Sequence, residues 1–143
     1  MHASLSAVRR HRRSAFTLIE LVAVIVVLAI LAGVAIPKYI DYAANAKASA
    51  CKGILGGVRS AIANFYANSA VSGTAAFPTL VQLTTVGTVV TEAVPANPYN
   101  NLATVTGVSW TTLQPVAGSF GWNYDATTGR FWANSNNVGE NLY

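Results

Sequence analysis

An unbroken apolar run dominates the hydrophobic pattern near the start of the chain. From Leu21 to Ile36 there is no charged or strongly polar side chain. As an α-helix rising about 1.5 Å per residue, the stretch from Phe16 to Ile36 spans roughly 30 Å, the thickness of a bilayer's hydrocarbon core. The pattern therefore predicts a membrane-spanning helix over residues 16–37.

Beyond Lys38 the pattern becomes amphipathic. Apolar residues recur at steps of three and four, which is typical of a helix with one buried face. They are Ile40, Ala44, Cys51, Ile54 or Leu55, Val58, Ile62 and Phe65. We therefore expect the helix to continue over residues 38–72 and to cover a globular body. Gly53 and Gly57 form a G-x-x-x-G motif, a weak signal outside a membrane.

Turn residues divide the remaining chain, residues 73–143. Gly73 and Pro78 end the helical pattern, and Pro95 and Pro98 interrupt the chain again. The alternating segment 104–113 predicts a strand, and the stretch "FGWNYDATTGRFWAN" predicts two strands joined by a turn that ends at Gly129. The expected fold class is α+β, a long amino-terminal helix packed on a small antiparallel sheet.

Charge is distributed very unevenly. The formal net charge is +4, but Arg9, Arg10, Arg12 and Arg13 all precede the apolar run. Apart from these four arginines, basic and acidic residues balance, so the chain lacks the basic surface that nucleic-acid binding requires. The arginines also orient the helix, because cytoplasmic flanks of membrane helices are enriched in Arg and Lys. The body is then expected on the opposite side of the membrane.

Glu20 is the exception within the apolar run. A basic stretch before an apolar one is also typical of a cleaved signal peptide, but this run is longer than the usual apolar core. An ionised carboxylate costs about 2.5–3.5 kcal/mol within a membrane and needs a partner, unless it snorkels to the boundary. A cut between Ala15 and Phe16 would supply that partner, since the new α-amino group is largely cationic at neutral pH.

The stretch "RRSAFTLIELVAVIVVLAILAGVAIPKY" resembles the leader and first helix of type IV pilins and of type II secretion pseudopilins. The resemblance implies a pilin-like fold, a basic leader over residues 1–15, cleavage before Phe16 by a prepilin peptidase, and N-methylation of Phe16. It further implies a helical homo-oligomeric filament in which Glu20 pairs with the amino terminus of a neighbouring copy. Ala15 departs from the glycine usual before the cut, yet alanine is the next smallest residue, so we expect cleavage to be retained.

Two helix-weakening residues lie near the far end of the apolar run. Glycine costs about 1 kcal/mol in a helix, and proline removes a backbone hydrogen bond. We expect the helix to bend or open at Gly33 and Pro37, and the stretch 29–37 to extend in a filament. The alternative is a passive proline at the end of a membrane helix.

The candidate chemistry of the body is sparse. Both histidines, His2 and His11, lie in the expected leader, and no Cys/His cluster or phosphate-binding glycine loop is present, so we predict no enzyme activity. Cys51 is the single cysteine, a buried thiol or an intermolecular link. The three tryptophans pack in the core or form a binding platform.

No cofactor is expected, with calcium as the one alternative. The resemblance to pseudopilins implies calcium in a carboxy-terminal loop. The oxygen-bearing candidates are Asp125, Asn134, Asn136, Asn137 and Glu140, of which the carboxylates Asp125 and Glu140 are the metal candidates.

The resemblance implies a structural subunit, most simply a major pseudopilin of a type II secretion system. The chain is short and has no disulfide loop, which favours this machine. The alternative is the major subunit of a surface type IV pilus, used for adhesion, motility or DNA uptake. Implied partners are the inner-membrane assembly platform and minor pilins or pseudopilins, and the implied location is the bacterial inner membrane, then a periplasmic or cell-surface filament. A monomeric membrane-anchored binding module is the rival from another class.

Overall fold

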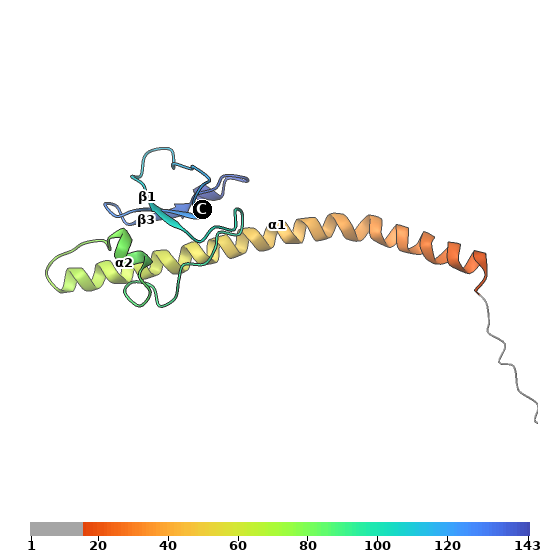
Figure 1. The fold of residues 1–143 in the computed structure, drawn as a ribbon, viewed down its shortest axis with the longest axis horizontal. Helices are drawn as coiled ribbons and strands as arrows, with labels where there is room; N and C mark the ends of the chain where they lie inside the picture. The colour runs from red at the N-terminus through yellow and green to blue at the C-terminus, as the bar shows by residue number, and fades with distance from the viewer. Residues whose placement is uncertain (1–15) are drawn as a thin grey trace, which may run out of the picture. The chain divides into compact units, whose positions relative to one another are not determined.

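The computed structural model describes residues 16–143 (Figure 1). The predicted leader, residues 1–15, lies outside the described residues. The elements run in the order α1 (Leu18–Val71), α2 (Leu80–Thr84), β1 (Val105–Gly107), β2 (Trp122–Asp125), β3 (Arg130–Ala133) and the short 3-10 helix η1 (Glu140–Leu142). The chain forms two compact units, which divide between Ile40 and Asp41. We call the second unit, Asp41–Tyr143, the body.

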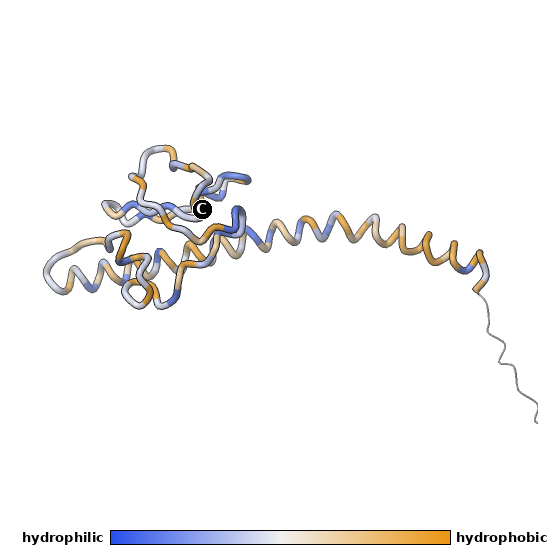
Figure 2. Tube along the Cα trace, viewed as in Figure 1, coloured by the Kyte–Doolittle hydropathy of each residue, from blue (hydrophilic) through white to orange (hydrophobic). Residues whose placement is uncertain are grey.

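The amino-terminal unit is an apolar stretch of α1 (Figure 2). Its large hydrophobic side chains are exposed, and an 18-residue window of α1 has a mean hydropathy of 3.0 with none of it buried. Within the described part of the chain, α1 is the helix long and apolar enough to cross a membrane. Water would strongly disfavour so much bare apolar surface, so this unit needs lipid or other copies around it.

α1 stays helical at Gly33 and Pro37, so the opening that the sequence allowed is absent from this structure, whereas the expected bend and the extension of residues 29–37 in a filament stay predictions. α1 runs unbroken through Pro37. Proline lacks the N–H that in an α-helix would bond to the carbonyl four residues earlier, here Gly33, and its ring crowds that same carbonyl, so the disturbance is confined to one turn. The turns on both sides keep their hydrogen bonds and hold the helix in register.

The body covers only part of the predicted apolar face of α1. Cys51, Leu55, Val58 and Ile62 are buried, as the pattern predicted. Ile40 and Ala44, the first two residues of that pattern, are exposed. The core of the body begins at Cys51, so the buried stripe is shorter than the sequence suggested.

The end of α1 follows from one glycine. Gly73 has a φ of +93°, and its N–H donates to the carbonyl of Ala70 at 3.1 Å, while the N–H of Thr74 donates to that of Ser69 at 3.1 Å. This pair of bonds is the Schellman motif, which needs a left-handed residue after the helix. The connection that follows contains a short helix, α2, capped by Thr79 and Gln82.

β2 and β3 form the predicted hairpin. They pair antiparallel, with Asn123 opposite Trp132 and Asp125 opposite Arg130. The turn closes where the N–H of Gly129, at a φ of +70°, donates to the carbonyl of Asp125 at 2.8 Å. The left-handed glycine at the end of this turn is the feature that the sequence predicted.

The sheet is mixed, which corrects the prediction of an antiparallel sheet. β1 lies beside β2 and runs parallel to it, with Val105 opposite Trp122. A parallel neighbour requires a long connection, and residues 108–121 provide it. That connection is fixed by a side chain distant in sequence: Asn134 Oδ1 accepts from the N–H groups of Ala117 and Gly118 at 2.7 and 2.8 Å.

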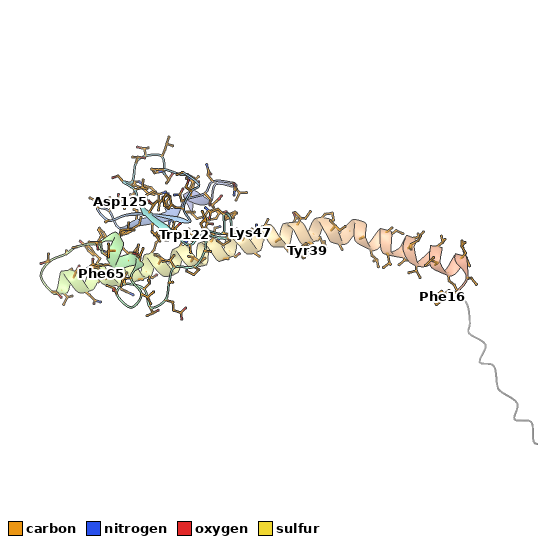
Figure 3. The ribbon with its side chains drawn as sticks, viewed as in Figure 1. Phe16, Tyr39, Lys47, Phe65, Trp122 and Asp125 are labelled. Atoms are coloured by element: carbon orange, nitrogen blue, oxygen red, sulfur yellow. The ribbon has the colours of Figure 1, made fainter. Side chains whose placement is uncertain are left out.

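Aromatic side chains are the largest members of the core. Trp122 and Trp132 are fully buried, and Trp122 stacks on Phe131 with ring centroids 5.5 Å apart. The indole N–H of Trp122, labelled in Figure 3, donates to the carbonyl of Pro95 at 2.8 Å. Core packing is therefore the role of these two tryptophans. Trp110 is only half-buried.

Candidate assembly site at the start of α1

The first residues of α1 form a compact polar group at one end of the apolar stretch. Thr17 directly precedes the helix, and Glu20 lies in its first turn. Glu20 Oε2 accepts from the backbone N–H of Thr17 at 2.8 Å and from its hydroxyl at 2.7 Å. The N–H of Glu20 in turn donates to Thr17 Oγ1 at 3.3 Å. This reciprocal pattern is a capping box.

The capping box gives Glu20 a structural reason to occupy its place. It satisfies backbone donors that every helix start leaves without partners, and the helix dipole favours an anion there. The role of Thr17 was not predicted, although the signature Thr-x-x-Glu before an apolar run was visible in the sequence. Within residues 16–143, the hydrogen bonds to this carboxylate all reach Oε2, so Oε1 remains available to another group.

The structure brings together some of the predicted assembly residues and separates others. Phe16, labelled in Figure 3, is 82% exposed and lies within about one helical turn of Glu20. Gly33 and Pro37 lie on the same helix, roughly 20 Å or more along its axis from Glu20. Ala15, the residue before the predicted cut, lies outside the described residues. The charge-bearing site is therefore confined to the first turn.

Asp125 closes the β2–β3 turn. Its carboxylate accepts from the N–H of Trp110 at 2.9 Å, the N–H of Thr127 at 2.8 Å and the hydroxyl of Thr128 at 2.9 Å. Burial raises the pKa of Asp125, but these hydrogen bonds outweigh it, so the pKa lies below its usual value. The group is a buried, ionised turn-former.

Glu140 holds the loop that precedes η1 in the same way, through its carboxylate. It is fully buried, and its two oxygens accept from the N–H groups of Asn137 at 3.0 Å and Val138 at 2.8 Å. Burial raises the pKa of Glu140, but the bonds from Val138 and Asn137 and from the Ser135 side chain outweigh it, leaving the pKa lowered.

These carboxylates do not fit a calcium site. Calcium needs six to eight oxygen ligands, whereas the groups around Asp125 and Glu140 are N–H and O–H donors directed at the carboxylates. In the described part of the chain, no three His, Cys, Asp or Glu side chains lie close enough to share a metal. Asn134, another candidate, uses its oxygen to hold the 108–121 connection.

Cys51 is a buried thiol. Its exposed fraction is 0%, and burial, followed by the nearby charge of Glu140, raises its pKa to about 11. A protonated, inaccessible thiol packs as a small hydrophobic side chain and does not form links between copies.

Comparison with known proteins defines the class to which this amino-terminal site belongs. Residues 10–36 match the family model of the prokaryotic N-terminal methylation motif. The start of α1 therefore carries a prokaryotic N-terminal methylation motif, and the long apolar helix with its small mixed sheet is consistent with a pilin-like α+β fold.

Among known proteins, the chain is similar to fimbrial protein EcpC of Eikenella corrodens, with 41% identity over 39% of this chain and 37% of that protein. It is also similar to type IV major pilin protein PilE of Neisseria gonorrhoeae, with 45% identity over 39% of this chain and 34% of that protein. A fimbrial protein of Neisseria meningitidis serogroup B is 47% identical over 37% of this chain and 31% of that protein. The chain thus spans about a third of the length of these relatives. No solved structure matches it significantly.

Proposed function

We propose that this protein is a structural, non-enzymatic subunit of a pilin-like filament. In this proposal the chain is cut between Ala15 and Phe16, Phe16 is N-methylated, and Glu20 pairs with the Phe16 amine of an adjacent copy. One observation carries the proposal: an exposed apolar helix starts with a single carboxylate in its first turn, inside the segment that matches a methylation motif.

The physical argument is one of unpaired charge in an apolar surrounding. Leucine, valine and isoleucine gain little by leaving lipid for one another, so packing of the α1 helices needs a polar contact to set its register. The free amine and the carboxylate are each costly in lipid, and they neutralise each other when neighbouring helices are offset correctly. Methylation keeps the amine's charge, so the pairing survives it.

The processing enzyme and the assembly machinery belong to the proposal. The substrate of the cut is a membrane precursor with its basic leader in the cytoplasm and its body across the inner membrane. Its partners are a prepilin peptidase, an inner-membrane assembly platform and minor subunits of the same filament.

Our first candidate for the filament is the pseudopilus of a type II secretion system. A small body without a disulfide supports this choice. The second candidate is a surface pilus, which the names of the relatives favour, although the similarity covers only 39% of this chain. Immunogold labelling of intact cells separates them: long surface filaments support the pilus, and filaments confined to the periplasm support the pseudopilus.

Two variants separate charge pairing from helix capping. Glutamine also serves in a capping box, so Glu20→Gln keeps the cap but removes the charge. Thr17→Ala removes the cap but keeps the charge. We expect Glu20→Gln to insert in the membrane and to lose most filaments in sheared-filament and electron-microscopy assays, while Thr17→Ala retains a larger share. Normal filaments from Glu20→Gln would refute the pairing.

A further inference from the structure

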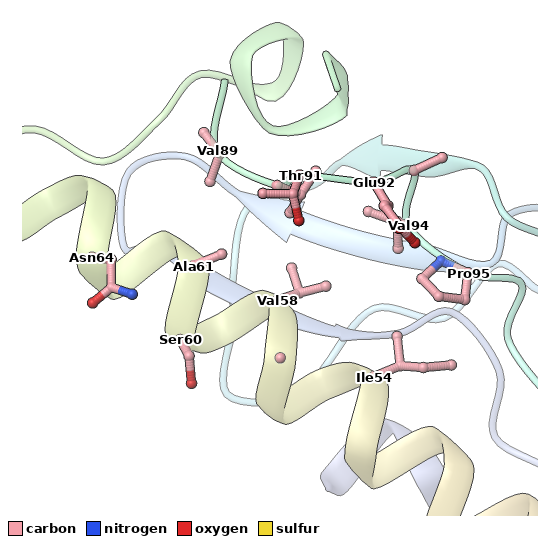
Figure 4. Close-up of a pocket in the computed structure, with 13 residues that line it drawn as sticks. Ile54, Val58, Ser60, Ala61, Asn64, Val89, Thr91, Glu92, Val94 and Pro95 are labelled. Atoms are coloured by element: carbon pink, nitrogen blue, oxygen red, sulfur yellow. The ribbon is translucent and has the colours of Figure 1, made fainter. Parts of the chain in front are cut away.

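A groove of about 480 Å³ lies along one flank of α1 in the body (Figure 4). One wall is α1 and the other is the segment Val89–Pro95. Figure 4 shows Val58 from α1, and Thr91 and Val94 from the segment, around the same space. Most of the lining is apolar, with Ile54, Val58, Val90 and Val94 contributing.

Glu92 is the single charged residue that lines this groove, and it is exposed. Of the four acidic side chains of the body, Asp125 and Glu140 are buried and already hold turns, which leaves Asp41 and Glu92 at the surface. The groove therefore offers apolar walls with one free negative charge at its rim.

The opposite flank of α1 is basic. At 3.6 residues per turn, Arg59 lies roughly half a turn from Gly57 and Ala61, which line the groove. The guanidinium of Arg59 donates from Nε to the carbonyl of Phe131 at 3.0 Å and from Nη2 to that of Tyr143 at 2.5 Å. Arg59 is therefore already engaged within its own chain.

Arg130 lies beside Arg59, but its guanidinium contacts an aromatic ring where that of Arg59 bonds to backbone carbonyls. Both line a second hollow, together with Trp110, Gly129 and Phe131, and none of these residues is acidic. The Arg130 guanidinium lies 4.3 Å from the centre of a Trp110 ring, which in turn packs edge-on against the buried Trp132. Within residues 16–143 no carboxylate pairs with Arg130, whose exposed guanidinium lies over the ring.

We propose that these two surfaces bind each other in adjacent copies of this chain. The Trp110–Arg130 edge of one copy covers the apolar groove of the next, and the Arg130 guanidinium pairs with the Glu92 carboxylate. Arginine stacked on an aromatic ring presents a planar set of donors that matches a carboxylate. The inference rests on the proposed filament function and adds a contact between bodies to the contact between helices.

The charge and the position of the two surfaces indicate that a second copy of this chain occupies the groove. The groove has a negative rim and the hollow a positive one, and they lie on opposite flanks of the same helix. Two different surfaces that bind head-to-tail join many copies into a ring or an open chain, whereas a surface that binds itself stops at a dimer. A second copy of this chain therefore supplies both complementarity and repetition.

The test is a charge exchange in the full-length protein. We expect Glu92→Arg and Arg130→Glu each to lower the yield of sheared filaments about tenfold, because each places like charges in contact. The double variant Glu92→Arg/Arg130→Glu restores the opposite pairing and should recover most of the yield. Lys47→Glu, a reversal at another exposed basic residue, is the matched control and should leave the yield near that of the wild type.

Each outcome decides the inference. Single variants that assemble normally, or a double variant that assembles no better than the singles, would overturn it. Glu92 is exposed, so the detergent-solubilised Glu92→Arg variant should unfold at the wild-type temperature, and the milder Glu92→Gln should lower the filament yield in the same direction. Arg130 lies opposite Asp125 and against the Trp110 ring, so Arg130→Glu should also lower the unfolding temperature, and the Glu92 variants carry the test. Wild-type filaments with a failed exchange would refute only this contact, whereas a wild type without filaments would refute the proposed function.

Discussion

At the scale of single residues, Glu140 links the stability of the body to pH. Its lowered pKa means that the ionised form stabilises the fold at any pH above its usual unfolded value of about 4.3. This contribution is lost as the pH falls through the lower pKa of the folded state. We expect the thermal midpoint of the full chain in detergent to fall progressively below about pH 4.3.

The variant Glu140→Gln provides the comparison. It loses one of the two backbone acceptors, so it should be less stable at pH 7 and show a shallower decline in acid. Asp125→Asn should behave similarly, since its carboxylate is held in the same way. An acid decline as steep in the combined variant Glu140→Gln/Asp125→Asn as in the wild type would assign the pH dependence to other groups.

Gly121 is a second residue with a definite expected effect. A Cβ added at this position would lie 1.8 Å from the carbonyl oxygen of Leu102, which is backbone and cannot move aside freely. Gly121→Ala should therefore cost roughly 3 kcal/mol of unfolding free energy and disturb the β1–β2 pairing.

Gly56→Ala is the matched control for that substitution. Gly56 lies within α1, is exposed, and has nothing within 4 Å of the place that a methyl group would take. Alanine there should stabilise the protein by about 1 kcal/mol, the difference in helix propensity. Chemical denaturation of both variants in the same detergent measures the two effects, and equal signs would contradict the argument.

At the scale of elements, α1 has one weak turn. Pro37 has no N–H, so the carbonyl of Gly33 lacks its usual helical partner. The chain keeps the helix closed here, yet this is the place where it should open first under load in a filament.

Hydrogen exchange of the solubilised full chain tests this point. We expect amides of residues 29–37 to exchange faster than those of residues 51–62, where α1 is buried against the body. Pro37→Ala should slow that exchange, because alanine restores the bond and favours the helix by about 3 kcal/mol. Equal exchange in wild type and variant would show that the proline does not set the weak point.

At the scale of the whole molecule, local signals predicted most of the architecture. The end of α1 depends on Gly73, the hairpin on the turn before Gly129, and the buried stripe on the spacing from Cys51 to Ile62. Each of these is decided by residues close together in sequence, so pattern and turn chemistry are enough to predict them.

The parts that the sequence did not reveal depend on distant contacts. The parallel β1 is held where the N–H groups of Gly121 and Trp122 donate to the carbonyl of Thr104, and the Asn134 side chain holds the connection between β1 and β2. No periodicity in the local sequence reveals these contacts. The groove beside α1 and the Trp110–Arg130 stack also join segments far apart in the chain. In contrast, the capping box of Thr17 and Glu20 is a local signal that the sequence carries and that our prediction overlooked.

The central claim is that the chain is trimmed to begin at Phe16 and that the new amine serves assembly. Intact-mass and amino-terminal peptide mass spectrometry of the protein from its filament fraction tests this claim most directly. We predict a subunit that begins at Phe16 and carries a methyl group on its α-amine. A filament-borne subunit that still carries the arginine-rich leader would contradict the account.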